Sequence, residues 1–228
     1  SCAICRISLT QGRTLCDACD GDLPRLTPPF CTRCGEPFPG AIDVAFDCPN
    51  CSTLKFAVQF ARPATIRDPR TLEMIHRLKY GRELHLVADL GRLAAEAFQD
   101  ARLTQALMEN WPLVPVPLHR WRFQHRHFNQ AAEISHALAR HTDLPVLDAL
   151  RRVRPTDHQT ALTRSQRMKN LHGAFTISPQ GRRWLAQKNS GAVLIDDVLT
   201  TGSTVDECAK TLRKAGFRSV VVVTIMRG

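Results

Sequence analysis

The sequence predicts an α/β protein in which helices cover a parallel sheet and a small metal-binding domain precedes the sheet. Two observations predict this fold. Eight of the nine cysteines fall within the first 51 residues, and the rest of the chain alternates apolar runs with stretches of helical spacing. Apolar residues make up 43% of the 228 residues and charged residues 23%, as in ordinary globular proteins. We expect residues 1–54 to form the cysteine-rich domain and residues 55–228 the α/β domain.

The cysteines are grouped in four C-x-x-C pairs, which are Cys2 and Cys5, Cys16 and Cys19, Cys31 and Cys34, and Cys48 and Cys51. Ten, eleven and thirteen residues separate successive pairs. This is close to the spacing of zinc ribbons, in which two pairs hold one Zn²⁺ through four thiolates. Eight thiolates therefore predict two zinc ions. We favour pairing the first pair with the second and the third with the fourth, because short spacers close small loops at low entropic cost. Cross-bracing is the alternative.

The sequence has no pattern of a membrane or secreted protein. No apolar run approaches the roughly 18 residues of a membrane-spanning helix, and residues 1–13 lack the apolar core of a secretory signal. We therefore expect a cytoplasmic protein. Disulfide bonds are the alternative use of the cysteines, and a reducing compartment disfavours them. No histidine precedes His76, so we expect the zinc ions to be structural rather than catalytic.

The α/β half begins with a strand and two helices. Alternating apolar residues predict a strand over residues 56–62, which ends before Pro63. Apolar residues at helical spacing predict a helix over residues 69–78, and residues 79–81 then form a break. Leucines and alanines that recur on one face predict a long helix over residues 83–102.

Three shorter elements follow. An apolar strand is expected over residues 113–118, where prolines suit the ends of a strand better than its middle. Helical spacing predicts a helix over residues 129–140, and a short strand is expected over residues 174–177.

The last unit carries the strongest pattern. It consists of a strand over residues 192–199, a Thr-Thr-Gly turn, a helix over residues 203–215 that ends at Gly216, and a strand over residues 219–226. Both strands are almost continuously apolar. The unit therefore predicts a βαβ crossover in a parallel sheet that is covered on both faces.

Two adjacent acids, Asp196 and Asp197, stand at the carboxyl end of the first strand of this unit. A hydroxyl-rich turn follows at once, formed by Thr200, Thr201, Gly202, Ser203 and Thr204. Because a helix begins here, free backbone N–H groups and the positive end of its dipole suit a monophosphate, while the acids suit two neighbouring ribose hydroxyls. A P-loop and a Rossmann fingerprint are excluded, because neither glycine pattern is present. An ordinary capped helix behind a strand with buried acids is the alternative.

Residues 193–204 resemble the motif with which type I phosphoribosyltransferases bind 5-phosphoribosyl pyrophosphate (PRPP). With the C-x-x-C pairs ahead of it, the whole chain resembles the ComF family, called ComFC or GntX in different bacteria. One departure is visible, because His127 stands where the family has glycine before Phe-Asn-Gln. Other family-like stretches are residues 78–81, 114–118, 126–130, 154–159 and 167–170.

The resemblance implies a type I phosphoribosyltransferase-like domain that binds PRPP together with Mg²⁺. It implies that Asp196 and Asp197 contact the ribose hydroxyls, directly or through Mg²⁺, and that residues 200–204 hold the 5′-phosphate. Lys79, Tyr80 and Gly81 match the region of the pyrophosphate loop, so that Asp196, Asp197 and Lys79 form the expected catalytic group. Some arginines of the hood loop are expected to reach pyrophosphate, a solvated basic segment being the alternative; these are Arg151, Arg152, Arg154, Arg164 and Arg167.

Basic charge is concentrated in the α/β half. Residues 1–51 carry four arginines against six acids, whereas residues 119–183 carry eleven arginines and one lysine against four acids. Within the latter, Trp121, Phe123 and Phe128 lie between arginines and histidines, a pattern that suits single-stranded nucleic acid. A packed surface helix, or a basic surface that only aids solubility, is the alternative.

Two functions from different classes remain open. The first is an enzyme that transfers or hydrolyses at C1 of PRPP, with an unknown acceptor. The second is a binding protein that holds a phosphoribosyl ligand or single-stranded DNA while it serves a helicase-like translocase in DNA uptake, the setting that the family resemblance implies. Cys208, the ninth cysteine, is expected to be a buried apolar residue and not a nucleophile.

Overall fold

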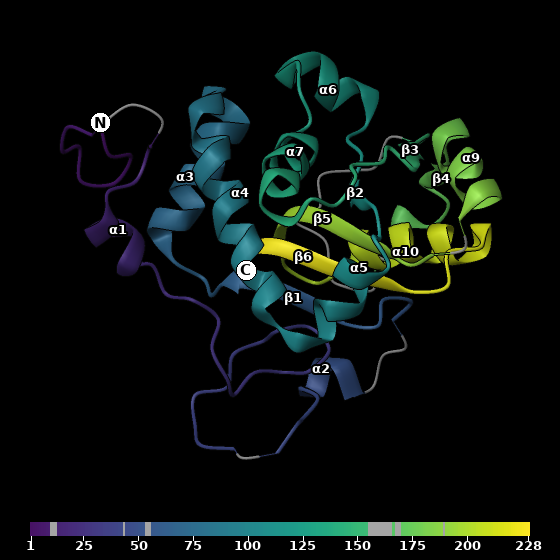
Figure 1. Ribbon diagram of the computed structural model, residues 1–228, viewed down its shortest axis with the longest axis horizontal. Coiled ribbons are helices and arrows are strands. Elements are labelled where there is room, and N and C mark those ends of the chain that lie inside the picture. The colour runs from purple at the N-terminus through teal and green to yellow at the C-terminus, as the bar shows by residue number, and fades with distance from the viewer. Residues whose placement is uncertain (10–12, 43, 53–55, 155–165, 167–169, 189) are drawn as a thin grey trace.

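The computed structural model describes residues 1–228 except 10–12, 43, 53–55, 155–165, 167–169 and 189 (Figure 1). Its centre is a parallel sheet of four strands in the order β1-β6-β5-β2. The strands are β1 (Ala61–Thr65), β2 (Leu113–Pro115), β5 (Ala192–Leu199) and β6 (Val220–Arg227). The two apolar strands of the last unit lie in the middle of the sheet, as a sheet covered on both faces requires.

Helices cover both faces of this sheet (Figure 1). On one face lie α3 (Pro69–Gly81), α4 (Val87–Glu96) and α7 (Gln130–Thr142), and on the other lies α10 (Ser203–Ala215). The side chains of β5 alternate between two apolar clusters: Val193 and Ile195 pack with α3, α4 and α7, whereas Ala192 and Leu194 pack with α10. The parallel α/β fold is thus confirmed.

The N-terminal segment covers the free edge of β1. Leu26 donates its N–H to the carbonyl of Ala64 (3.0 Å), and Ile66 donates to the carbonyl of Pro24 (3.1 Å). Ala61 donates to the carbonyl of Arg33 (2.7 Å). The edge of the sheet is therefore occupied by the chain that joins the two cysteine clusters.

The first strand and the long helix differ from expectation. Strand β1 lies later than residues 56–62 and contains Pro63, which an edge strand tolerates because it has neighbours in the sheet on one side only. Residues 83–102 are not one helix: the helical path ends at Gln99, and Asp100 is extended and caps the next turn through Arg102 N–H (3.0 Å). The pieces are η1 (Leu84–Leu86), α4, η2 (Ala97–Gln99) and η3 (Ala101–Leu103), followed by α5 (Thr104–Met108).

Several short elements complete the described chain. The expected strand at 174–177 is β4 (Phe175–Ile177), which pairs antiparallel with β3 (Leu150–Arg152) in a separate ribbon. The remaining helices are α1 (Asp17–Gly21), α2 (Pro49–Ser52), α6 (Arg120–Arg126) and α9 (Pro179–Gln187). None of the helices in the described ranges is both long and apolar enough to cross a membrane.

Candidate functional site

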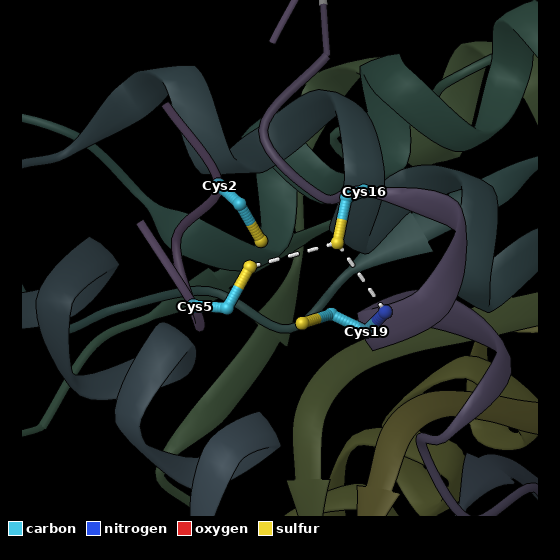
Figure 2. Close-up of side chains that lie close together, drawn as sticks. All are labelled: Cys2, Cys5, Cys16 and Cys19. Atoms are coloured by element: carbon cyan, nitrogen blue, oxygen red, sulfur yellow. Dashed lines mark hydrogen bonds between the residues drawn. The ribbon is translucent and has the colours of Figure 1, made fainter. Parts of the chain in front are cut away.

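Four cysteines of the first ribbon, residues 1–22, converge on one point. Figure 2 shows Cys2 and Cys5 facing Cys16 and Cys19, with the sulfur atoms turned inward. All four sulfur atoms lie within 4.8 Å of one another. The Sγ atoms of Cys5 and Cys16 are 3.7 Å apart. A tetrahedral zinc with Zn–S bonds of about 2.3 Å places its sulfur atoms roughly 3.8 Å apart, so the cluster has the dimensions of a Cys₄ zinc site.

The second ribbon, residues 31–51, repeats this arrangement with more burial. Its cluster consists of Cys31, Cys34, Cys48 and Cys51, three of which are buried. The Sγ atoms of Cys34 and Cys48 are again 3.7 Å apart. A hydrogen bond with the Cys34 thiol lowers the pKa of Cys31 to about 4, and this thiolate accepts the N–H of Cys48 (3.2 Å). The expected pairing of neighbouring C-x-x-C pairs is confirmed, and the clusters form two structural zinc sites.

The acid pair at the end of β5 lies beside a lysine from a distant helix. Lys79, in the last turn of α3, forms an ion pair with Asp197, whose side chain is buried. Asp197 also accepts the N–H of Val198 (3.0 Å), and Asp196 accepts the N–H of Asp197 (2.9 Å). Burial and the charge of Asp197 raise the pKa of Asp196 well above its ordinary value, although Lys79 opposes this. Lys79 therefore pairs with Asp197 and also lies close enough to Asp196 for its charge to lower the pKa of that carboxyl.

Residues 79–81 are helical and do not form the expected break. They are the last residues of α3, and the chain turns only at Arg82, whose φ of 57° is left-handed. Lys79 reaches the acid pair, whereas Tyr80 is 71% exposed and Gly81 is exposed as well. The Tyr80 ring lies under the Arg126 guanidinium of α6, at 5.1 Å. Of the three residues matched to the pyrophosphate loop, Lys79 alone contacts the acid pair.

The turn between β5 and α10 has the shape of an anion cradle. Gly202 precedes α10 with a φ of 75°, a conformation that costs glycine little, and this residue has no side chain with which to cap the helix. Thr201 Oγ1 accepts the first N–H of the helix, that of Ser203, over a long 3.5 Å, and a ligand could accept hydrogen bonds from the amides that follow. The hydroxyl oxygens Thr201 Oγ1 and Ser203 Oγ lie 3.0 Å apart in this turn. Residues 198–205 line a small pocket together with Asp196, so the turn and this acid face one space.

Arg227, at the end of β6, supports this turn, and the sequence analysis did not single it out. Its guanidinium donates to the carbonyls of Leu199 (2.6 Å) and Thr200 (2.9 Å) and forms an ion pair with Glu36 of the second ribbon. The sequence does carry a signal for this residue. Arg227 follows seven apolar or hydroxyl residues, at the carboxyl end of a central strand. The second ribbon is thereby connected to the turn.

The basic segments are only partly described. Arg152 packs its guanidinium 5.4 Å from the centre of the Phe175 ring, and Arg154 donates to the carbonyls of Asn170 (2.8 Å) and His172 (2.7 Å). Arg151 is exposed on β3, while Arg164 and Arg167 lie outside the described residues. The described arginines thus lie around the β3–β4 pair.

His127 adopts the conformation that glycine favours. Its φ is 65°, so the tight turn before α7 forms without glycine. Such a backbone costs a residue with a side chain about 1 kcal/mol. Asn129 stabilises the turn, because it caps α7 through Ala131 N–H (3.1 Å) and donates to the carbonyl of Val116 (3.1 Å).

Cys208 is fully buried in α10, as expected. Burial, together with the charge of Asp196, raises the pKa of its thiol well above the ordinary value. A thiol in this state is a weak nucleophile, so Cys208 contributes to packing.

Comparisons with known proteins agree with this architecture. Residues 1–53 match the family model of the double zinc ribbon domain. The chain is 31% identical to competence protein F of Haemophilus influenzae over 231 residues and 32% identical to the DNA utilization protein YhgH of Escherichia coli over 233 residues. Each alignment covers 99% of this chain and 96% of the relative.

A more distant relative is the competence protein ComFC of Bacillus subtilis, with 24% identity over 234 residues, 96% of this chain and 86% of the relative. These alignments therefore span both the zinc ribbons and the sheet of this chain. The chain belongs to the ComF family of competence and DNA utilization proteins.

Proposed function

We propose that the chain is a Mg²⁺-dependent PRPP-binding protein of the ComF family that acts in DNA uptake, with phosphoribosyl transfer as its chemistry. The observation that supports it is that Asp196 and the start of α10 line one pocket at the carboxyl edge of the sheet, while the neighbouring Asp197 pairs with Lys79. Open α/β sheets bind their ligands at this edge. The role in DNA uptake is supported by the names of the competence and DNA utilization relatives.

The acid pair suits the ribose and a divalent cation. Carboxylate oxygens are the ligands that Mg²⁺ takes in proteins, and Asp196 and Asp197 would be the residues that hold it. A Mg²⁺ ion held there would neutralise part of the charge on the pyrophosphate oxygens. Asp196 and Asp197 accept hydrogen bonds from the two ribose hydroxyls, and the turn at residues 200–204 holds the 5′-phosphate.

Cleavage at C1 requires that both a positive and a negative charge be stabilised. The C1–O bond breaks with positive charge growing on the ribose ring and negative charge on the departing pyrophosphate. In this proposal the acid pair stabilises the ribose, and Lys79, which pairs with Asp197, supplies the cation for the leaving group. The remaining contribution is positioning, because the cradle and the acid pair fix the two ends of the phosphoribosyl group.

A second candidate is binding of single-stranded DNA near the same edge. It is supported by exposed aromatic rings beside cations: Tyr80 is 71% exposed under Arg126, and Phe123 of α6 is 50% exposed. Aromatic faces stack on bases while arginine neutralises phosphate. In this function the chain holds DNA and a phosphoribosyl ligand for a helicase-like partner without performing catalysis.

Calorimetric titration with PRPP and Mg²⁺ tests the first proposal. Changing both Asp196→Asn and Asp197→Asn removes two negative charges with little change in volume, and we expect PRPP affinity to fall at least about tenfold, or roughly 1.4 kcal/mol. The exposed Asp143→Asn is the matched control and should bind as the wild type does. Equal affinity in wild type and double variant shows that the acid pair is misassigned.

Pyrophosphate release separates the enzyme from the binding protein. We expect release from PRPP and Mg²⁺ in wild type, and its loss in the double variant. Binding without release, with or without single-stranded DNA, favours the second candidate.

A further inference from the structure

A cavity of about 250 Å³ lies between the second ribbon and the turn before α10. One wall is formed by residues beside the zinc cluster, including Cys34 and Cys51, and the opposite wall by residues 199–202 and Val205. Phe56 and Val58 close it on the side of the chain that leaves the ribbon. The two halves of the protein therefore build this cavity together.

The cavity adjoins the proposed phosphate cradle. Residues 199–202 and Val205 line both this cavity and the small pocket that contains Asp196. The Phe56 ring lies beside Gly202, since a Cβ added to that glycine would be 3.6 Å from ring atom Cε1. The cavity and the cradle are thus adjacent, because the turn before α10 forms part of the wall of both.

The lining indicates the chemistry of the occupant. Phe56, Val58 and Val205 offer apolar surface, and the aromatic ring offers a face for stacking. Polar groups lie on the same lining: Asn50 has an amide that both donates and accepts, and Arg33 and Arg227 bring guanidinium groups. Apolar walls with a few polar groups are typical of sites for flat heterocycles.

We propose that this cavity binds the base of a nucleoside 5′-phosphate, so that the second ribbon forms one wall of a nucleobase site. The inference rests on the proposed function, because the phosphate of the same ligand occupies the cradle. It gives the second zinc ribbon a direct part in ligand recognition. Phe56 stacks on the base, and Asn50 contacts its polar edge.

The test compares four nucleoside 5′-monophosphates (AMP, GMP, CMP and UMP) with ribose 5-phosphate by calorimetric titration. At least one nucleotide should bind about tenfold more tightly than ribose 5-phosphate, because stacking on an aromatic ring contributes about 1–3 kcal/mol per base. Phe56→Ala should remove most of this difference and leave ribose 5-phosphate affinity within about twofold. Phe38→Ala, an aromatic change elsewhere in the same ribbon, is the matched control and should keep the difference.

A second variant tests the cavity without depending on the folding of Phe56→Ala. Asn50 is exposed, and Asn50→Trp should block the cavity without loss of zinc. We expect nucleotide affinity to fall to that of ribose 5-phosphate. If all four nucleotides bind no better than ribose 5-phosphate in wild type, or if Asn50→Trp keeps the preference, the nucleobase site is refuted while the cradle stands. If neither ribose 5-phosphate nor any nucleotide binds, both the cradle and the nucleobase site are refuted.

Discussion

The two zinc ribbons share a ligand pattern but are attached to the molecule in different ways. The first ribbon lies beside α3 and α4, whereas the second lies below β1 and next to the turn before α10 (Figure 1). The first is held chiefly by charged side chains on helices. The second is held by strand-like backbone contacts and by Arg227. The same metal site thus serves as a support in one place and as a wall of the candidate ligand site in the other.

A buried carboxylate anchors the first ribbon. Asp89 of α4 accepts the N–H groups of Thr14 (2.8 Å) and Leu15 (3.1 Å) and the hydroxyl of Thr14 (2.5 Å). Beside it, Arg92 pairs with Asp20 (2.7 Å), and Arg25 pairs with Glu96 (2.8 Å). None of these groups contacts the phosphate cradle. We conclude that the first ribbon stabilises the helical layer.

The second ribbon is connected to the cradle at two points. Glu36 pairs with Arg227, which donates to the carbonyls of the turn. Asp206, in the first turn of α10, accepts the N–H of Ala57 (2.7 Å), just beyond the ribbon. We therefore expect a change of shape in the second ribbon to alter the cradle, and a change in the first ribbon to leave it unaltered.

Removal of each zinc site in turn tests this difference most strongly. Changing both Cys31→Ser and Cys34→Ser should lower the zinc content from two to one and reduce PRPP affinity at least about tenfold, because the wall beside the cradle loosens. Changing both Cys2→Ser and Cys5→Ser should also remove one zinc but leave PRPP affinity within about twofold. Metal analysis and calorimetry measure both. If both double variants lost PRPP affinity equally, the two ribbons would not differ in their effect on the cradle.

Removal of the Asp89 carboxylate tests how the first ribbon is anchored, because it leaves the zinc ligands unchanged. Asp89→Ala leaves the buried N–H groups of Thr14 and Leu15 without their acceptor, and we expect the free energy of unfolding to fall by about 3 kcal/mol. Urea unfolding measures this, with the exposed Asp143→Asn as the control. A loss below about 0.5 kcal/mol would mean that the ribbon is anchored elsewhere.

The connection through Arg227 is expected to have a smaller effect. Arg227→Met removes both donors to the turn, and PRPP affinity should fall about fivefold, or roughly 1 kcal/mol, with both zinc ions retained. Arg213→Met, on the exposed side of α10, is the control for lost charge. Unchanged calorimetric affinity in Arg227→Met would show that the cradle holds its shape without this arginine.

An effect of similar size is expected at Asp20 of the first ribbon. Burial raises the pKa of this carboxyl, but hydrogen bonds from Arg92 and Arg25 outweigh burial and hold it below its ordinary value. A depressed pKa stabilises the fold above the unfolded value of about 3.9 and loses this contribution as pH falls through the folded value. Asp20→Asn should therefore cost about 1 kcal/mol in urea unfolding, equally at pH 5 and pH 8. A cost that changes between these pH values would contradict the depressed pKa.

The last βαβ unit was predictable from the sequence because its information is local. Continuous apolar runs, a Thr-Thr-Gly turn and Gly216 define strand, turn and helix end within a few residues, and β5 and α10 begin and end where expected. The zinc clusters were predictable for the same reason, since each spacer is short.

Long-range packing decided what the sequence analysis missed. The position of β1 depends on its register with β6, where Ala61 pairs with Val222, and no local pattern encodes it. The end of α3 was placed too early, because the helix continues through Lys79 until Arg82 turns left-handed. The pairing of Lys79 with Asp197 joins elements far apart in the chain, so spacing alone could not predict it.

The covered edge of β1 leaves the sheet with fewer backbone groups for another molecule to pair with. A free edge strand presents unpaired N–H and C=O groups that recruit strands of other molecules. Here residues 24–26 and Arg33 occupy these groups on β1, and Pro63 lacks an N–H altogether. The cysteine-rich segment therefore shields the sheet from intermolecular pairing, and an α/β half expressed without it is expected to aggregate through β1.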